Sequence, residues 1–265
     1  MKKLDKRHYK ELVPALKGVS INHLFAQAVL EKVVDGLVYV DEVDKPGACY
    51  IKHPYGMSLL FGETTVAAFK NELWSYMSER TQERGTDEWL QVFPDSWAEE
   101  IIRNCTTMEK HTRVNFKFNE SRYLSERKMV KDHPQNCRVV PTKSIGSGQI
   151  KGSVCPRYFW RNEEHFANSG AGYSLLVDDE IAATAFSAFI HGNQLELGIE
   201  TMKEHQGKGF ARMACAALID YCLENGYEPV WACRLENTAS FHLAQKLGFE
   251  PMAYLPYFRI KAGSI

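Results

Sequence analysis

The spacing of apolar residues along the chain predicts short helices and strands in alternation. Apolar positions recur at helical spacing in residues 22–34. Three apolar runs follow, separated by the turn signals Asp44-Lys45-Pro46-Gly47 and Pro54-Tyr55-Gly56, and these predict strands. The first part of the chain is therefore expected to contain a helix at 22–34, strands at 37–43, 48–53 and 57–61, a helix at 64–80, a strand at 88–93, a helix at 96–104 and a strand at 114–118.

The same order of elements returns after a connector between residues 121 and 152, where the pattern is weak and a strand is expected only at 138–140. Because each half carries a similar succession, we predict an α/β protein made of two copies of one unit, residues 1–135 and 136–265. The expected elements of the second half are a helix at 159–167, strands at 172–177, 181–191 and 194–201, a helix at 209–224, a strand at 229–233, a helix at 238–247 and a strand at 250–257.

Charge and composition narrow the classes of partner. Lys and Arg number 32 against 33 Asp and Glu, so the net charge of −1 gives no support for binding to nucleic acid or to an anionic membrane. No apolar run is long enough for a membrane span, and the first residues do not resemble a secretory signal. The seven cysteines include no Cys-x-x-Cys pair, which favours free thiols and a cytoplasmic location. No metal site is expected, because no His/Cys cluster has ligand spacing.

The segment from residue 194 to residue 224 combines a strand of strict alternation with an amphipathic helix. From Phe210 to Cys222 the apolar residues recur at helical spacing, and residues 203–209 join this helix to the strand. The strand places alternate side chains on opposite faces. These are Leu195, Leu197 and Ile199 on one face, and Gln194, Glu196, Gly198 and Glu200 on the other.

The turn that opens this helix has the composition of a pyrophosphate site. Gly207 and Gly209 let the backbone approach a ligand closely, and the helix N-terminus and Lys208 favour negative charge. The alternative is that the glycines only form a tight strand-to-helix turn. The chain lacks both the Gly-x-x-x-x-Gly-Lys-Ser/Thr motif and an early Gly-x-Gly-x-x-Gly, so an ATPase or a dinucleotide dehydrogenase is not expected.

The residues Gln206-Gly207-Lys208-Gly209-Phe210-Ala211 match the Gln/Arg-x-x-Gly-x-Gly/Ala signature of the GNAT superfamily of N-acetyltransferases. Residues 237–249, which begin with asparagine and end in Gly-Phe, resemble a later helix of the same superfamily. Within it, the chain resembles the zwittermicin A resistance type through Glu196-Leu197-Gly198-Ile199-Glu200-Thr201, Pro229-Val230-Trp231-Ala232-Cys233 and residues 237–249.

This resemblance implies a GNAT fold, a mixed and mostly antiparallel central sheet flanked by helices, and acetyl-CoA as cosubstrate. The pyrophosphate would lie on the amides of residues 207–212, and the pantetheine would lie beside residues 196–201. The junction Phe61-Gly62-Glu63-Thr64-Thr65 of the first half lacks the second glycine, so that half is expected to be a degenerate copy without a cofactor. The residues expected at the cofactor are Ile199, Glu200, Thr201, Gln206, Gly207, Lys208, Gly209, Phe210, Ala211, Arg212, Asn237 and Ser240.

Two carboxylates on the cofactor strand are candidates for the base that deprotonates an amine. We expect this role for Glu196, with Glu200 as the second candidate; the alternative for both is a solvated strand face or a structural ion pair, and for Glu200 we favour that alternative. Many family members carry a tyrosine acid where this chain has Ala244. Tyr254 and Tyr257 are the candidates to replace it, unless they are aromatic core residues.

The activity implied is transfer of an acetyl group to the amine of a small molecule by direct attack on the thioester. The likeness to the zwittermicin A resistance type implies an amine-bearing small molecule, with an antibiotic as one candidate; peptide or protein amines are the alternative acceptors. A monomer or a homodimer is expected. The alternative is a non-catalytic acyl-CoA-binding sensor or scaffold module, which Ala244 favours. Asn237 is expected to cap its helix, and the resemblance adds a contact with the pantetheine arm.

Overall fold

The computed structural model describes residues 1–78, 85–106, 108–128 and 136–262. The chain forms two compact units: the first comprises residues 1–113, 234–236 and 254–265, and the second comprises residues 114–233 and 237–253. The expected boundary between residues 135 and 136 lies at the edge of a segment outside the described residues. The compact units divide elsewhere, because the strands β6 (Glu109–Phe118), β12 (Ala232–Arg234) and β13 (Phe249–Ile260) each run from one unit into the other.

The sheet of the first unit begins with five strands in the order β1-β2-β3-β4-β5, and β13, β6 and β12 follow β5. β2, β3 and β4 pair antiparallel, β4 and β5 pair parallel, and β5 pairs antiparallel with β13. Apolar side chains of α3 and α4 share a core with strand residues such as Leu60 and Leu90. The elements are β1 (Lys2–Lys3), α1 (Val13–Leu16), α2 (Leu24–Leu30), β2 (Leu37–Val40), β3 (Ala48–Lys52), β4 (Met57–Gly62), α3 (Ala67–Ser78), β5 (Glu88–Phe93) and α4 (Ser96–Asn104).

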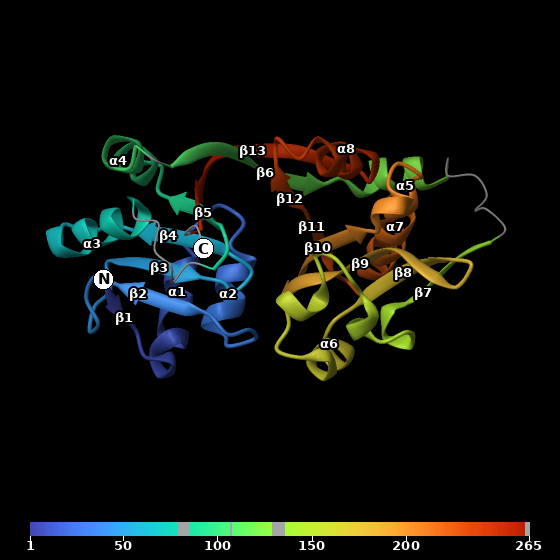
Figure 1. The fold of residues 1–265 in the computed structure, drawn as a ribbon, viewed down its shortest axis with the longest axis horizontal. Coiled ribbons are helices and arrows are strands. Elements are labelled where there is room, and N and C mark those ends of the chain that lie inside the picture. Colours follow the sequence, from blue (N-terminus) through green and yellow to red (C-terminus); the bar gives the residue numbers. More distant parts are fainter. Residues whose placement is uncertain (79–84, 107, 129–135, 263–265) are drawn as a thin grey trace. The chain divides into compact units, whose positions relative to one another are not determined.

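The second unit is built on a five-stranded sheet of order β11-β10-β9-β8-β7. The strands from β7 to β10 pair antiparallel, and β11 pairs parallel with β10. The helix α7 (Phe210–Glu224) lies against β8, β9 and β10 (Figure 1). The other elements are α5 (Glu120–Lys128), β7 (Cys137–Pro141), α6 (Glu163–Ser169), β8 (Gly172–Val177), β9 (Glu180–His191), β10 (Gln194–Thr201), β11 (Glu228–Val230) and α8 (Thr238–Lys246).

The predicted α/β architecture with two similar units is confirmed, and most predicted elements lie within a few residues of the observed ones. The single strand expected at 229–233 is wrong. β11 ends at Val230 and β12 begins at Ala232 in the other sheet, with the buried Trp231 between them. The helix α5 was not predicted, because its residues are mostly charged and, among its residues 120–127, only the Tyr123 side chain is buried.

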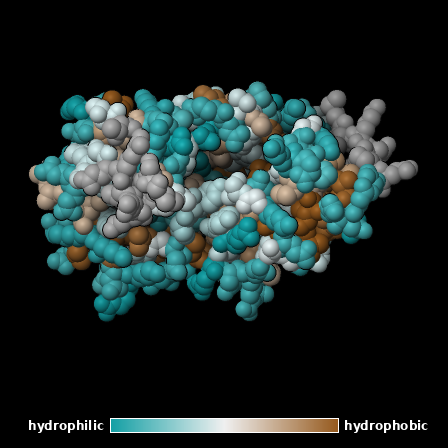
Figure 2. Space-filling model, viewed as in Figure 1, coloured by the Kyte–Doolittle hydropathy of each residue, from teal (hydrophilic) through white to brown (hydrophobic). Residues whose placement is uncertain are grey.

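The visible face of the molecule is mainly hydrophilic (Figure 2). All seven cysteines are free thiols, and all except the partly exposed Cys137 are buried. None of the helices in the described part of the chain has the length and apolar character needed to span a bilayer. Within the same residues, no group of three His, Cys, Asp or Glu side chains is arranged to hold a metal ion.

Candidate active site

The strand β10 leaves its parallel neighbour β11 halfway along its length. The two strands pair from Gln194↔Glu228 to Glu196↔Val230, where β11 ends. Residues 197–201 of β10 continue and pair only with β9 among the described strands. Since alternate main-chain groups of a strand point to opposite sides, part of this segment presents N–H and C=O groups away from β9. The open edge therefore can pair with an extended ligand.

The strand is also irregular at the point where the edge opens. The register between β10 and β9 shifts between Glu196 and Leu197, as in a β-bulge. Glu196 pairs with Phe189 and Leu197 pairs with Ser187, so the extra residue is Ala188 of β9, and the regular ladder between the two strands is interrupted here. The main-chain N–H groups on the open edge of β10, beyond its pairing with β11, are suited to donate a hydrogen bond to a carbonyl oxygen of a bound molecule.

The turn after β10 has the backbone that an anion site requires. Gly207 and Gly209 have φ of 77° and 83°, the left-handed region that favours glycine. A Cβ atom at either position would meet no heavy atom within 4 Å, so the space in front of the turn is open. Gly209 directly precedes α7 without a side-chain cap.

The main-chain amides of this turn are available to a ligand. The N–H groups of residues 207–211 donate to no main-chain carbonyl of the described residues, whereas the next two, those of Arg212 and Met213, bond to the carbonyl of Gly209. The α7 helix is 15 residues long, and its dipole favours negative charge at this end. Lys208 is exposed beside the turn and adds a positive charge. The turn has the donors to hold a diphosphate.

Gln206 joins the turn to the open strand. Its side-chain Nε2 donates a 3.3 Å hydrogen bond to the carbonyl oxygen of Thr201, the last residue of β10. Arg212, also predicted at the cofactor, instead places its guanidinium 3.2 Å from the carboxylate of Glu126 and so ties α7 to α5. The hydrogen bond of Gln206 therefore holds the turn at residues 207–211 next to the end of the open strand segment 197–201.

The predicted N-cap at the start of α8 is confirmed. The Asn237 side chain accepts a 3.2 Å hydrogen bond from the main-chain N–H of Ser240. The Ser240 hydroxyl in turn accepts a 3.2 Å bond from Nε1 of Trp231, the residue directly after the end of β11. Trp231 was not predicted as a site residue, because the sequence predicts one continuous strand at 229–233 and gives no sign that the strand is interrupted there.

Glu196 is a buried carboxylate at the position where the edge opens. Its side chain is 5% exposed, and its neighbours across the sheet are Phe189 on β9 and Val230 on β11. Its place beside the bulge and the open edge fits a base, and this role remains a prediction.

Glu200 has a structural contact that the sequence did not reveal. Its Oε2 accepts a 2.7 Å hydrogen bond from the N–H of Val154 and a 3.2 Å bond from the hydroxyl of Ser153. A Cβ atom at Gly152, which has φ of 115°, would lie within 2.6 Å of the same side chain. The Glu200 carboxylate thus holds the turn at residues 152–155 in place.

The two tyrosines proposed as acids belong to the first unit. Tyr254 is exposed, whereas Tyr257 is buried and stacks on Trp89 with a ring separation of 5.2 Å. The guanidinium carbon of Arg113 lies 5.3 Å from the centre of the Tyr257 ring. The contacts of Tyr257 are those of a packed aromatic residue, and the catalytic role of either tyrosine remains a prediction. Ala244, in the position of the family tyrosine, is fully buried.

The corresponding junction of the first unit is closed. β4 and β5 pair from Met57↔Trp89 to Phe61↔Phe93, the last residue of β5, so no counterpart of the open edge exists between these strands. Beyond Gly62 a hollow of about 530 Å³ is lined by Glu63 and Glu100 among others. The Lys70 ammonium is already 2.8 Å from the Glu100 carboxylate. The hollow is lined by the two carboxylates of Glu63 and Glu100 and by one cation, Lys70, which is already paired. This excess of negative charge disfavours binding of a diphosphate.

The model of the GNAT acetyltransferase family matches residues 15–257, and the chain belongs to this family. The family transfers acetyl groups from acetyl-CoA. An uncharacterized N-acetyltransferase of Bacillus subtilis (strain 168), YdfB, is 24% identical over 242 residues, which cover 88% of this chain and 89% of YdfB. The L-amino acid N-acyltransferase MnaT of Escherichia coli (strain K12) is 32% identical over 108 residues, 37% of this chain and 62% of MnaT.

Two solved structures show the same fold over nearly the whole chain. A GCN5-related N-acetyltransferase-like protein from Streptococcus suis 89/1591 has a TM-score of 0.71 at 18% identity and covers 96% of this chain and 99% of its own. A tandem GNAT protein from the clavulanic acid biosynthesis pathway has a TM-score of 0.61 at 12% identity, with 100% and 98% covered. The fold is therefore a GNAT fold with two units in tandem.

Proposed function

We propose that the protein is an acetyl-CoA-dependent N-acetyltransferase that acts on the amine of a small molecule, with its cofactor in the second unit. One observation carries the proposal. The turn at residues 207–211, with its free amides, directly follows a strand segment, 197–201, whose edge is open. These are the two surfaces that the diphosphate and the amide-containing pantetheine arm of coenzyme A need.

The residues of β10 supply the chemistry in this proposal. The extended pantetheine pairs with residues 197–201, which orients the thioester toward the bulge between Glu196 and Leu197. A main-chain N–H in residues 197–199 polarises the thioester carbonyl. Glu196 takes the proton of the attacking ammonium group, directly or through water, because only the neutral amine is a nucleophile. The thiolate of coenzyme A is the leaving group.

The acceptor class rests on two resemblances. The sequence motifs resemble the zwittermicin A resistance type, and MnaT is named for L-amino acids as acceptors. Both point to an amine-bearing small molecule, and the first makes an antibiotic a candidate. Action as a monomer or homodimer in the cytoplasm, without nucleic acid or membrane, is part of the same proposal.

A second candidate function is a non-catalytic acyl-CoA-binding sensor or scaffold. The buried Ala244 favours it, since a methyl side chain cannot protonate the departing thiolate. This candidate shares the cofactor site and differs only in turnover.

The two candidates are separated by measuring thiol release from acetyl-CoA with a panel of amines. The enzyme releases thiol with at least one amine, and Glu196→Gln removes this activity while calorimetry shows unchanged binding of coenzyme A. Glu180→Gln, on the exposed start of β9, is the matched control and retains activity. Tight binding without turnover for every amine overturns the enzyme and leaves the sensor.

A further inference from the structure

A small hollow between three helices of the second unit lies next to the proposed diphosphate turn. α5, α7 and α8 each contribute residues to it or directly precede one that does, and α7 begins directly after the turn (Figure 1). Among the described residues of its lining, three carry a positive charge and none is acidic; the cations are Arg127, Arg212 and Lys246. The hollow encloses only about 10 Å³, the space of a single water molecule, so a ligand can bind at its mouth but not inside it.

Arg212 is the cation nearest to the turn along the chain. It lies in the first turn of α7, three residues after Gly209 and therefore about 4.5 Å further along the helix axis. Side chains of an α-helix lean toward its N-terminus, so the Arg212 side chain leans toward the amides of residues 207–211. Its Nη2 donates to the carboxylate of Glu126 at 3.2 Å and to the carbonyl oxygen of Glu126 at 3.4 Å. A guanidinium carries five N–H donors, so further donors remain for a ligand.

Lys246 and Arg127 add positive charge at the same hollow. Lys246 is exposed in the last turn of α8, and its ammonium makes no ion pair within the part of the chain that the structure describes. The Arg127 guanidinium lies 3.0 Å from the carboxylate of Asp220. Each arginine of the lining is thus matched by one carboxylate, Asp220 or Glu126, whereas Lys246 is not. This uncompensated positive charge favours an anion at the mouth of the hollow.

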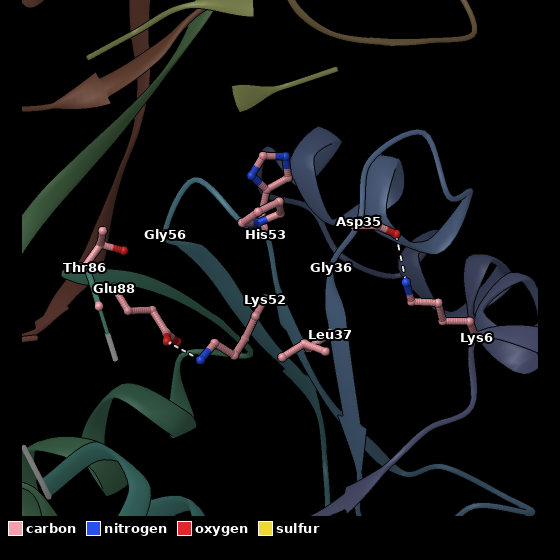
Figure 3. A pocket seen from close by; sticks show the side chains of 11 residues that line it. Lys6, Asp35, Gly36, Leu37, Lys52, His53, Gly56, Thr86 and Glu88 are labelled. Atoms are coloured by element: carbon pink, nitrogen blue, oxygen red, sulfur yellow. Dashed lines mark hydrogen bonds and ion pairs between the residues drawn. The ribbon is translucent and has the colours of Figure 1, made fainter. Parts of the chain in front are cut away.

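A cavity of the first unit lacks this excess of positive charge. Its volume is about 360 Å³, and Figure 3 shows the side chains that line it. The Lys6 ammonium is 2.8 Å from the Asp35 carboxylate, and the Lys52 ammonium is 2.9 Å from the Glu88 carboxylate. Each of these two lysines is thus paired with a carboxylate of the same lining. The hollow between α5, α7 and α8 is therefore the better site for an anion.

Coenzyme A carries a second anionic group close to its diphosphate. The 3′-phosphate and the 5′-diphosphate are attached to the same ribose ring, so only this ring separates them. A diphosphate on the amides of residues 207–211 therefore brings the 3′-phosphate within one ribose of the turn, and the first turn of α7 with Arg212 lies within that distance. Because the hollow is only as large as one water molecule, the residues that line it, Lys246 included, lie around one point.

We propose that the mouth of this hollow binds the 3′-phosphate of coenzyme A, with Lys246 as its principal partner and Arg212 beside it. The 3′-phosphate site rests on the proposed acetyltransferase function, because the diphosphate on the turn brings the phosphate there. It gives the second unit a preference for coenzyme A over 3′-dephospho-coenzyme A. Lys246 contributes to binding and not to the chemical step, because the 3′-phosphate and the thioester are at opposite ends of acetyl-CoA.

The test is a calorimetric titration of the full chain with coenzyme A and with 3′-dephospho-coenzyme A. The unaltered chain binds coenzyme A more tightly by about tenfold to a hundredfold, the effect of charge-assisted hydrogen bonds to one phosphate group. Lys246→Met weakens the binding of coenzyme A by about tenfold and leaves the binding of 3′-dephospho-coenzyme A unchanged. Lys143→Met, at an exposed lysine of the same unit outside the hollow, is the matched control and keeps the preference of the unaltered chain.

A lysine in the last turn of α8 also stabilises that helix. Loss of this structural effect weakens both ligands equally, so the ratio of the two dissociation constants isolates the contact with the 3′-phosphate. In acetyl transfer, Lys246→Met raises the KM for acetyl-CoA and leaves kcat unchanged.

The proposal is overturned if the unaltered chain binds the two compounds equally well, or if Lys246→Met weakens both by the same factor. The acetyltransferase proposal survives either result, because the diphosphate and the pantetheine are common to both compounds. If neither compound binds, both proposals are overturned.

Discussion

The carboxylate of Glu200 accepts a 2.7 Å hydrogen bond from the main-chain N–H of Val154, 46 residues earlier in the chain. Ser153 adds a second bond to the same oxygen, and Gly152 lies against it. The end of the proposed pantetheine strand therefore holds the turn at residues 152–155 in place. This contact gives Glu200 a structural function, which differs from the catalytic function proposed for Glu196.

Glu200→Ala is expected to lower the free energy of unfolding by about 1–2 kcal/mol, since the half-buried main-chain N–H of Val154 and the exposed hydroxyl of Ser153 lose a charged acceptor. Glu200→Gln keeps an acceptor oxygen and is expected to cost less and to retain most of the turnover. Urea unfolding and the acetyl-transfer rate check both values. A loss of kcat by a hundredfold in Glu200→Gln, with stability unchanged, would make Glu200 the base instead.

The sequence predicts what depends on local periodicity and misses what depends on distant partners. The strict alternation at 194–201 and the helical spacing after Phe210 predict the bounds of β10 and α7 to within one residue of those observed. The polar helix α5 has no such period; it docks through the Tyr123 hydroxyl, 2.9 Å from the carbonyl of Ala216, and through Arg127, 3.0 Å from Asp220.

The same limit applies to the candidate site. Its glycine turn and the cap at Asn237 are local and were predicted, because turn and capping chemistry act over a few residues. The contact of Glu200 with Val154 joins segments far apart in sequence, so its residue type alone does not reveal it. Likewise, a continuous apolar run gives no sign that Trp231 separates strands of two sheets.

Glu196→Gln is expected to reduce kcat by about 10²–10⁴-fold at neutral pH, the usual contribution of a general base. The loss shrinks as pH rises, because the amine then loses its proton without help. The KM for acetyl-CoA stays the same. Rate profiles from pH 6 to 10 check this, and an equal loss at every pH contradicts the assignment of Glu196 as the base.

The chain is expected to bind one acetyl-CoA, because β4 and β5 remain paired to Phe93 and leave no open edge in the first unit. Replacing Thr64 by glycine puts a second glycine two residues after Gly62, the spacing of Gly207 and Gly209, but leaves the strands paired. Equilibrium dialysis of this variant is therefore expected to show one bound cofactor per chain. Two bound cofactors would show that the glycine alone was missing.

His53 is expected to make the fold less stable in acid. Burial lowers its pKa from 6.5 to about 3. Between these values the unfolded chain takes up a proton that the folded chain does not, so stability falls as pH decreases, by at most about 1.4 kcal/mol per pH unit from this group. Below pH 3 its contribution no longer changes.

His53→Asn retains an acceptor for the N–H of Tyr55, which bonds to Nδ1 of His53 at 3.1 Å. Urea unfolding at intervals from pH 7 to pH 4 is expected to show a shallower pH dependence in this variant. His8→Asn, at an exposed histidine, serves as the control. Equal slopes in the unaltered chain and in His53→Asn contradict the burial of a neutral ring.

The central claim is that main-chain amides at the start of α7 hold the diphosphate of coenzyme A. Gly209→Glu puts a carboxylate into the open space before these amides. Gly192→Glu is the matched control: Gly192 has φ of 57° and equally open surroundings, and it lies in the hairpin turn between β9 and β10, at the other end of β10. A glutamate there has a similar conformational cost in the left-handed region. Calorimetric titration with acetyl-CoA is expected to give one site in the unaltered chain and in Gly192→Glu, and none in Gly209→Glu. Normal binding by folded Gly209→Glu contradicts the account.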